Sequence, residues 1–348
     1  MSSGGGRIHS IDRRRFLATA GAAAAAPLLV SCSRGSDAPV LRPAGVPLGP
    51  FGAKSTAEEV TAGIDLSGRT VLVTGATSGL GLETLRVLAL RGAHVIATGR
   101  TLDKAREACA TVQGRTTPLA LELERWDTVA AAADQVRALG MPLDMLICNA
   151  GIMALPKLEQ VGGLEKQFVV NHLGHFVLVN RLLPQVQAAA QGRVVVLSSM
   201  GYRWAPEAGI EFDNLSGERG YEPNRMYGQS KLANGLFSLE LARRLREAGS
   251  SATSNAVHPG VINTNLGRHF ESWKRAAASL IGWTFMKSVE AGAATSCYVA
   301  TAAALAQVSG YYFEDCNPVV PSPGKHMDDP VMAAALWKTS EQLVAGYL

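Results

Sequence analysis

Several features that would assign a protein to a special class are missing from this sequence of 348 residues. Its cysteines form no CxxC pair, and no cluster of histidine and cysteine has the spacing of a metal site. We therefore predict no metal site, and we interpret Cys109 and Cys148 as small buried hydrophobic residues rather than disulfide partners or reactive thiols. Repeats and coiled-coil heptads are also missing, which leaves an ordinary globular protein as the expected class.

Excess charge is missing from most of the chain. The net charge is +4, but five of the 33 basic residues and one of the 29 acidic residues lie within residues 1–36. The rest of the chain therefore carries 28 residues of each sign. Such a neutral domain gives no electrostatic reason to expect a nucleic acid as partner.

The uncharged stretch Phe16–Val30 is too short to cross a membrane. Its fifteen residues would form a helix about 22 Å long, shorter than the roughly 30 Å core of a bilayer. A short apolar segment after a basic region is typical of a signal peptide. Residues 1–32 are therefore expected to be a leader, and residues 33–65 a linker that is either a free tether or a segment lying on the surface.

Two short motifs in this leader resemble known export signals. "DRRRFLA" resembles the twin-arginine motif, with Arg13 and Arg14 as the pair, although Asp12 and Ala18 depart from the usual pattern. "LVSC" resembles a bacterial lipobox, which implies that Cys32 is acylated and is the chain's contact with a membrane. These resemblances imply export to the periplasm or a lipid-anchored place at the cell envelope. If the leader does not function, the protein would be cytoplasmic.

Residues 69–100 have the pattern of a βαβ unit. A short apolar run, Val71–Val73, leads through three glycines into a helical pattern of leucines, and a second apolar run follows at residues 94–98. Glycines after the first strand allow a tight turn, and the N-terminus of the helix presents free N–H groups to an anion. This unit predicts a site for the pyrophosphate of a dinucleotide.

Three motifs together carry a family resemblance: the glycine spacing TGxxxGxG, the tripeptide NAG after a later apolar strand, and the pair in "YGQSK". Through them, residues 66–345 resemble the short-chain dehydrogenase/reductase family, in particular its retinol-dehydrogenase-like branch. The resemblance implies one domain over residues 66–348 with an α/β fold: a doubly wound, Rossmann-type three-layer sandwich around a seven-stranded parallel sheet. It also implies which residues line the cofactor phosphates: Gly75, Ser78, Gly79, Leu80 and Gly81.

The end of the second strand bears on the choice of cofactor. NAD-preferring members of the family place an acidic residue there, whereas this strand ends in "ATGRT", where Arg100 can face a 2′-phosphate. NADP is therefore the expected cofactor, and NAD is less favoured. The resemblance implies further cofactor contacts from Glu122 and Leu123, with Glu in place of the family's usual Asp, and from the tripeptide Asn149, Ala150 and Gly151.

Tyr227 and Lys231 are four residues apart in a long helical pattern, so they share one face of a helix. A phenol with a pKa near 10 is a poor base at neutral pH, and a nearby ammonium group favours the phenolate. We therefore expect Lys231 to lower the pKa of Tyr227 and to hold the nicotinamide ribose. Tyr227 can then take a proton from an alcohol or give one to a forming alkoxide.

The resemblance supplies two further catalytic residues. A buried strand ends in a serine pair, of which Ser199 is the expected hydroxyl beside the substrate oxygen and Ser198 is the alternative. Asn171 is expected to hold a water that links Lys231 to solvent. An insertion before Tyr227 is similar to one in the retinol-dehydrogenase-like branch, where it would help wall the substrate pocket.

The segment after the next apolar strand reads "VHPGVINTNL". By resemblance, four of its residues border the nicotinamide: Pro259, Gly260, Val261 and Thr264. Residues 265–287 are expected to be a substrate lid, whose aromatic and aliphatic side chains indicate either an apolar substrate or simple packing on the core. His172 and His175 lack a third ligand at any obvious spacing, so we interpret them as packing residues.

The sequence therefore predicts an NADP-dependent oxidoreductase that interconverts an alcohol and a ketone or aldehyde on an apolar small molecule. The alternative from another class is a non-catalytic dinucleotide-binding sensor or scaffold protein, although such a protein would not need Tyr227. A nucleotide-sugar epimerase or dehydratase is disfavoured by the glycine spacing. A homo-oligomer is implied by family analogy alone.

Overall fold

The computed structural model describes Met1, residues 40–262 and residues 286–348. The predicted leader, its Cys32, and the first part of the predicted linker lie outside these residues, as do Thr264 and most of the predicted lid. Within the described residues, no helix combines the length and the apolar character needed to span a bilayer.

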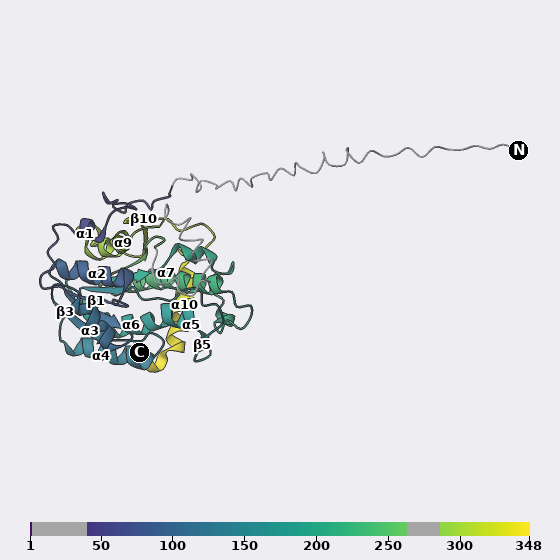
Figure 1. The fold of residues 1–348 in the computed structure, drawn as a ribbon, viewed down its shortest axis with the longest axis horizontal. Coiled ribbons are helices and arrows are strands. Elements are labelled where there is room, and N and C mark those ends of the chain that lie inside the picture. Colours follow the sequence, from purple (N-terminus) through teal and green to yellow (C-terminus); the bar gives the residue numbers. More distant parts are fainter. Residues whose placement is uncertain (2–39, 263–285) are drawn as a thin grey trace. The chain divides into compact units, whose positions relative to one another are not determined.

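A single large sheet forms the centre of the domain (Figure 1). Its order is β10-β9-β8-β7-β4-β1-β2-β3, and β1, which is central, pairs with both β2 and β4. The crossovers between parallel strands are mostly helical, as in doubly wound α/β folds. The strands are β1 (Thr70–Val73), β2 (His94–Gly99), β3 (Thr116–Ala120), β4 (Met145–Cys148), β7 (Arg193–Leu197), β8 (Thr253–His258), β9 (Tyr312–Glu314) and β10 (Asn317–Val319).

The sheet has eight strands, where the sequence predicted seven. Seven strands are parallel, as predicted, and the additional strand, β10, pairs antiparallel with β9. The chain reverses between them through Asp315 and Cys316, which have φ values of 51° and 61°. Hairpin turns with positive φ are usually marked by glycine or asparagine, so this turn gave no signal in the sequence.

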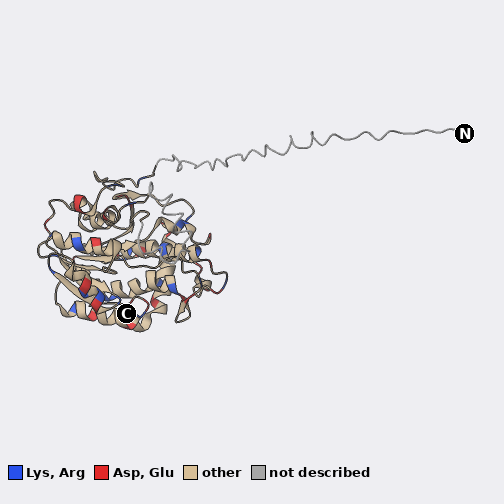
Figure 2. Ribbon diagram, in the orientation of Figure 1, with Lys and Arg blue, Asp and Glu red and all other residues tan. Residues whose placement is uncertain are grey.

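Helices cover both faces of the sheet, and successive strand residues point to alternate faces. Leu72 packs into one hydrophobic cluster, with α4 (Trp126–Ala138), α6 (Gly174–Ala188), α7 (Pro223–Glu247) and α10 (Pro330–Leu343). Val71 and Val73 pack into the other, with α1 (Ala57–Val60), α2 (Gly79–Leu90), α3 (Leu102–Ala110) and α9 (Val289–Thr301). In Figure 1, α2 and α9 lie on one side of β1, and α4 and α6 lie on the other. Figure 2 shows basic and acidic residues interspersed along the helices.

Short elements complete the described chain. A π-helix, η1 (Val169–Leu173), lies between α5 (Lys166–Phe168) and α6. The other short elements are the hairpin strands β5 (Gln160–Val161) and β6 (Leu164–Glu165) and the 3-10 helices η2 (Met200–Trp204), η3 (Phe212–Asn214), η5 (Ala303–Leu305) and η6 (Ala345–Tyr347).

Residues 41–51, which we call the N-terminal strap, lie against β10 and α9. The Val320 N–H donates to Leu41 O at 2.9 Å, and the Asn317 side chain donates to Phe51 O at 2.7 Å. The Phe51 ring packs edge-on against Tyr298 of α9, with 5.5 Å between ring centroids. This part of the predicted linker therefore lies on the protein surface, where it covers the outer edge of the sheet.

Candidate active site

The predicted site residues gather at the carboxyl ends of the parallel strands. This is the edge at which ligands bind in open α/β sheets. Seven predicted positions follow directly after five different strands: Gly75 after β1, Arg100 after β2, Asn149 after β4, Ser198 and Ser199 after β7, and Pro259 and Gly260 after β8.

The turn between β1 and α2 requires two of its glycines for different reasons. Gly75 has a φ of 66°, and a Cβ on it would stand 2.9 Å from the Ala150 Cβ. A Cβ on Gly81 would overlap the Gly75 carbonyl oxygen. Ser78 is the N-cap of α2, but its side chain makes no capping hydrogen bond. The first N–H groups of α2 therefore remain available to an anion, and the cradle fits a pyrophosphate.

Thr74, which the sequence analysis missed, connects the glycine turn to the segment after β4 by hydrogen bonds. Its hydroxyl accepts from the N–H groups of Asn149 and Ala150 at 2.9 and 3.0 Å. The same oxygen lies 2.9 Å from His175 Nε2, while His175 Nδ1 donates to the carbonyl of Asn171 at 3.0 Å. Since the carbonyl accepts, Nε2 is the unprotonated nitrogen and receives the Thr74 hydroxyl hydrogen. The threonine directly before the glycines was the only signal for this network.

The predicted adenosine-side residues occupy the ends of β2 and β3. Gly75 N–H donates to the Thr98 hydroxyl at 3.3 Å, so the end of β2 lies beside the glycine turn. Arg100 follows directly, is exposed, and makes no ion pair within the described part of the chain. Glu122 is half-buried, with its backbone bonded to Thr128, and Leu123 is buried. The structure therefore leaves the Arg100 side chain exposed, two residues after the Thr98 that contacts the glycine turn.

Tyr227 and Lys231 lie one turn apart on α7, and both are buried. The Lys231 ammonium lies 5.8 Å from the centre of the Tyr227 ring and donates to Leu197 O at 3.0 Å. Burial lowers the pKa of Lys231 to about 8. It raises the pKa of Tyr227 to about 12, and a hydrogen bond with Ser199 opposes that rise. The expected lowering of the Tyr227 pKa by Lys231 is therefore not found: burial raises the pKa, and the opposing group is Ser199.

The structure separates the two candidate serines. Ser198 is buried, and its hydroxyl donates to the backbone oxygen of Lys231 at 2.8 Å. Ser199 caps η2, where its hydroxyl accepts from Gly201 N–H at 3.0 Å and faces the Tyr227 phenol. Of the two, Ser199 has the hydroxyl beside the tyrosine.

Asn171 lies within the π-helix η1, and its side chain is bonded mainly to protein. Its amide donates to Ile152 O and to the Ser230 hydroxyl, both at 2.9 Å, and its Oδ1 accepts from Ile152 N–H at 2.8 Å. A Cβ on Gly151 would lie 3.2 Å from Asn171 Oδ1 and 3.4 Å from Lys231 Nζ, so both polar atoms lie close to Gly151. One lone pair of Oδ1 remains for the predicted water.

The two histidines of this region are held by protein partners. His172 Nε2 lies 2.8 Å from the Ser340 hydroxyl, and both ring nitrogens of His175 are bonded as described above. Burial lowers the pKa of His172 to about 3 and that of His175 to about 4, so both are neutral near pH 7. Within residues 40–262 and 286–348, no group of histidine, cysteine, aspartate and glutamate has metal-site geometry.

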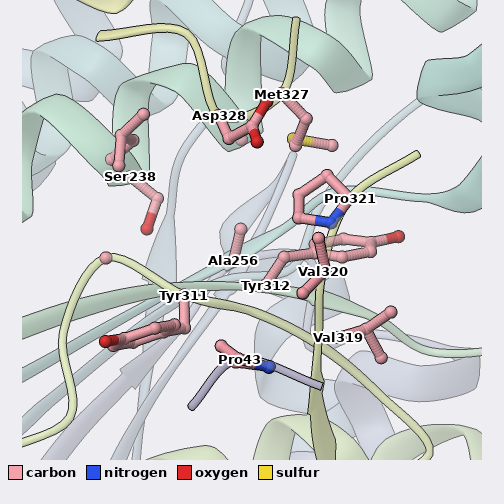
Figure 3. A pocket seen from close by; sticks show the side chains of 13 residues that line it. Pro43, Ser238, Ala256, Tyr311, Tyr312, Val319, Val320, Pro321, Met327 and Asp328 are labelled. Atoms are coloured by element: carbon pink, nitrogen blue, oxygen red, sulfur yellow. The ribbon is translucent and has the colours of Figure 1, made fainter. Parts of the chain in front are cut away.

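The segment after β8 and the Trp204 ring are two further parts of the predicted site region. Gly260 has a φ of 98°, and Val261 is 50% exposed. Trp204 is 49% exposed, and the centroid of its ring lies 6.4 Å from that of Tyr227. A separate apolar cavity of about 230 Å³ lies elsewhere, between α7, β9 and β10. Figure 3 shows Met327 and Asp328 on one side of it and Pro43 on the other; it includes none of the predicted site residues.

Comparisons with known proteins agree with this arrangement. A family model described as short chain dehydrogenase matches residues 69–275. The chain is 41% identical over 304 residues to short-chain dehydrogenase TIC 32 A, chloroplastic, of Brassica napus, covering 84% of this chain and 94% of that protein. It is 39% identical over 299 residues to human retinol dehydrogenase 14, covering 80% of this chain and 87% of the relative.

Two solved structures are similar in fold as well as in sequence. An uncharacterised protein from Mycobacterium paratuberculosis aligns with a TM-score of 0.68 and 36% identity, over 84% of this chain and 98% of that one. The complex of Pseudomonas aeruginosa RhlG with NADP aligns with a TM-score of 0.57 and 25% identity, over 72% and 95% of the two chains.

Proposed function

The chain belongs to the short-chain dehydrogenase/reductase family, and from that premise we propose that it interconverts an alcohol and a ketone or aldehyde by hydride transfer with NADP. One observation carries the proposal: the buried Tyr227 phenol faces the Ser199 hydroxyl, and Lys231 lies one turn away on the same helix. A protein that only bound a dinucleotide would not need this arrangement.

The residues around the glycine turn support a nicotinamide dinucleotide as cofactor. Gly75 and Gly81 leave room that a Cβ would fill, and the unused N–H groups of α2 would hold the pyrophosphate. The exposed Arg100 would bind a 2′-phosphate, which supports NADP over NAD. When bound, the nicotinamide supplies or accepts the hydride.

The protein's own residues would handle the proton. With its pKa raised to about 12, Tyr227 carries its proton at neutral pH and can donate it to the carbonyl oxygen of a substrate as that oxygen gains charge. The Ser199 hydroxyl would hydrogen-bond the same oxygen. In the opposite direction the phenol must first lose its proton, so oxidation of an alcohol should be favoured at higher pH and reduction near neutrality.

An apolar substrate is supported by what surrounds Tyr227. The half-exposed Trp204 ring offers apolar surface beside the Tyr227 ring, and the exposed Val261 would add apolar surface at the nicotinamide end of the site. The relatives named retinol dehydrogenase 13 and 14 point in the same direction through their names. We infer that the substrate is an apolar alcohol or its carbonyl counterpart.

The proposed place of action is the cell envelope. The twin-arginine motif at Arg13 and Arg14 and the lipobox ending in Cys32 are the support for export and for a lipid anchor. The twin-arginine route carries folded proteins, so the cofactor could be loaded before export. A protein that works far from the cytoplasmic pool would have to hold its cofactor tightly.

The test is to mix the purified protein with NADPH or NADH and a set of apolar aldehydes and ketones, and to follow the absorbance of the reduced nicotinamide. We expect oxidation of NADPH with at least one carbonyl compound, and slower oxidation of NADH. Binding of NADPH without turnover of any compound would favour the sensor or scaffold alternative. Equal use of NADH would contradict the proposed role of Arg100.

A further inference from the structure

The loop that follows β8, residues 259–262, is attached to Lys287, the second residue of the described range 286–348. Lys287 N–H donates to Val261 O at 2.8 Å, and Ile262 forms a parallel bridge with Lys287. We call residues 259–262 the β8 loop. Its position beside the carboxyl end of β8 would bring it to the nicotinamide half of the cofactor, so the inference below rests on the proposed function.

The Lys287 side chain lies across the backbone of the β8 loop. A Cβ on Gly260 would stand 2.6 Å from the Lys287 Cδ, so the aliphatic stem of the lysine fills the space that a side chain would take. The φ of 98° at Gly260 also excludes most other residues. The loop and the lysine stem are therefore fitted to one another.

The Lys287 ammonium ends at a carboxylate on a different part of the sheet. Its Nζ lies 2.5 Å from Asp315 Oδ1, in the turn between β9 and β10. The lysine side chain is only 13% exposed and the aspartate side chain 44%, so the pair is screened less than one on the open surface. The Asn317 side chain donates to Asp315 O at 2.9 Å and to Phe51 O of the N-terminal strap at 2.7 Å, which fixes the turn from outside.

The far end of the β8 loop and the start of α2 meet the same residue of α9. The side chains of Ile262 and Leu80 both lie against Gly292 of α9, whose missing Cβ makes room for them. Leu80 is the second residue of α2, which begins at the predicted phosphate cradle. The β8 loop is thus bonded to Lys287 and ends near the first turn of α2. A shift of Lys287 would therefore displace the loop on the nicotinamide side of the site.

We propose that Lys287 is a positioning residue: its stem and its ion pair with Asp315 hold the β8 loop against bound nucleotide, and so slow the release of the cofactor. No part of this pair would touch the reacting atoms. Slow release is what an enzyme needs if it is loaded with cofactor in one compartment and works in another.

The test measures the dissociation rate of NADPH by stopped flow, using the fluorescence of the bound nicotinamide and an excess of NADP as competitor. Lys287→Met keeps the aliphatic stem over Gly260 and removes the charge, and Asp315→Asn removes the partner charge at a half-exposed position. Lys287→Arg keeps the charge and is the conservative rescue. Arg137→Met, which breaks a surface ion pair with Asp134 on α4, is the matched control.

We expect Lys287→Met and Asp315→Asn each to raise the release rate about tenfold, and the double variant to add little to either. Lys287→Arg should stay within about threefold of the wild type, and Arg137→Met should not differ from it. Melting temperatures without nucleotide should change little, whereas a merely structural role would lower them and leave release unaltered.

Two failures are distinguishable. Release at the wild-type rate from both Lys287→Met and Asp315→Asn would overturn the role of Lys287 and leave the proposed function in place. Absence of NADPH and NADH binding by the wild type would overturn the proposed function itself.

Discussion

At the scale of single residues, the buried ammonium group of Lys231 lowers the stability of the fold at a position that the proposed chemistry uses. Lys231 is buried, and its pKa of about 8 lies below the ordinary value of 10.5. A lowered lysine pKa means that the folded protein holds the charged form less readily than the unfolded chain does. At neutral pH, where lysine is charged in both states, this costs about 3 kcal/mol of folding free energy. The protein keeps an ammonium group there despite that cost, which fits a functional role.

Lys231→Met should therefore raise stability while it lowers activity. Leu197 O keeps its bond from Asn234 at 2.8 Å, so removing the ammonium leaves no acceptor unpaired. We expect roughly 2 kcal/mol more resistance to urea at pH 7 and a large loss of turnover. The gain should shrink as the pH rises from about 8 to 10.5, because over that window only the unfolded wild type holds the lysine proton, and each rise in pH weakens that preference for the unfolded state. A variant less stable than the wild type at pH 7 would contradict this assignment.

Arg100 offers a second test at this scale. If the exposed Arg100 binds the 2′-phosphate, Arg100→Ala should weaken NADPH binding by about 10- to 100-fold, the loss expected for a charge-assisted hydrogen bond. NADH, which has no 2′-phosphate, should bind as before. Titration calorimetry of both nucleotides measures this, with Arg106→Ala on α3 as the control. An equal loss for both nucleotides would mean that Arg100 does not distinguish them.

The sequence predicted those residues whose chemistry depends on near neighbours. Tyr227 and Lys231 were found because four residues along a helix is one turn, and Gly75 was found because a turn after a strand needs it. Thr74 and Lys287 were missed, since their partners, Asn149 and Asp315, are 75 and 28 residues away. A single sequence gives no signal for such a pair before the fold brings it together.

At the scale of elements, the π-helix η1 and helix α6 carry two buried neutral histidines. His172 also packs among Phe168, Phe176 and Phe237, with ring centroids 5.1 to 6.0 Å apart. Burial lowers the pKa of His172 to about 3 and that of His175 to about 4. Short π-helices are frequent at functional sites, and η1 also carries Asn171.

These histidines should make the fold sensitive to acid. The unfolded chain binds protons near pH 6.5, whereas folded His172 and His175 resist them to about pH 3 and pH 4. Stability is therefore fully present above about pH 6.5 and is lost as the pH falls toward 4, by roughly 2–3 kcal/mol per histidine at about pH 4.5. Urea unfolding at several pH values should show this slope.

His172→Phe should reduce that slope by about one proton, because it keeps the aromatic packing and removes one titrating group. Ser340→Ala is the control: it removes the partner of His172 and leaves the histidine, so its slope should stay steep. If His172→Phe kept the full wild-type slope, His172 would not be a source of the acid sensitivity.

The order of strands and helices was predictable, and the end of the sheet was not. The βαβ pattern predicted the first two strands, and the family resemblance implied a seven-stranded parallel sheet. Strand β10 is three residues long and follows a turn through Asp315 and Cys316, so it carries no periodic signal. The N-terminal strap has no periodicity either, and its place depends on contacts with β10.

At the scale of the whole molecule, the N-terminal strap joins the region after the predicted leader to the catalytic domain. Arg42 donates to Pro318 O at 2.7 Å, and Gly49 N–H donates to the Asn317 side chain at 3.2 Å.

Truncation tests the strap directly. A chain that begins at residue 40 should melt like the full domain, whereas one that begins at residue 52 should melt roughly 5 °C lower, because it loses the Phe51 contact with Tyr298 and the hydrogen bonds to β10. Phe51→Ala in the longer chain should show part of that loss. Equal melting of both truncated chains would mean that the strap does not stabilise the domain.

The central claim is that Tyr227 exchanges the proton while the nucleotide exchanges the hydride. The most direct measurement compares Tyr227→Phe with the wild type, in both turnover of a carbonyl substrate and the dissociation constant of NADPH. The account predicts that turnover falls by about a thousandfold or more, with the dissociation constant changed by less than about threefold. A variant that binds NADPH as the wild type does and turns over at a comparable rate would contradict it.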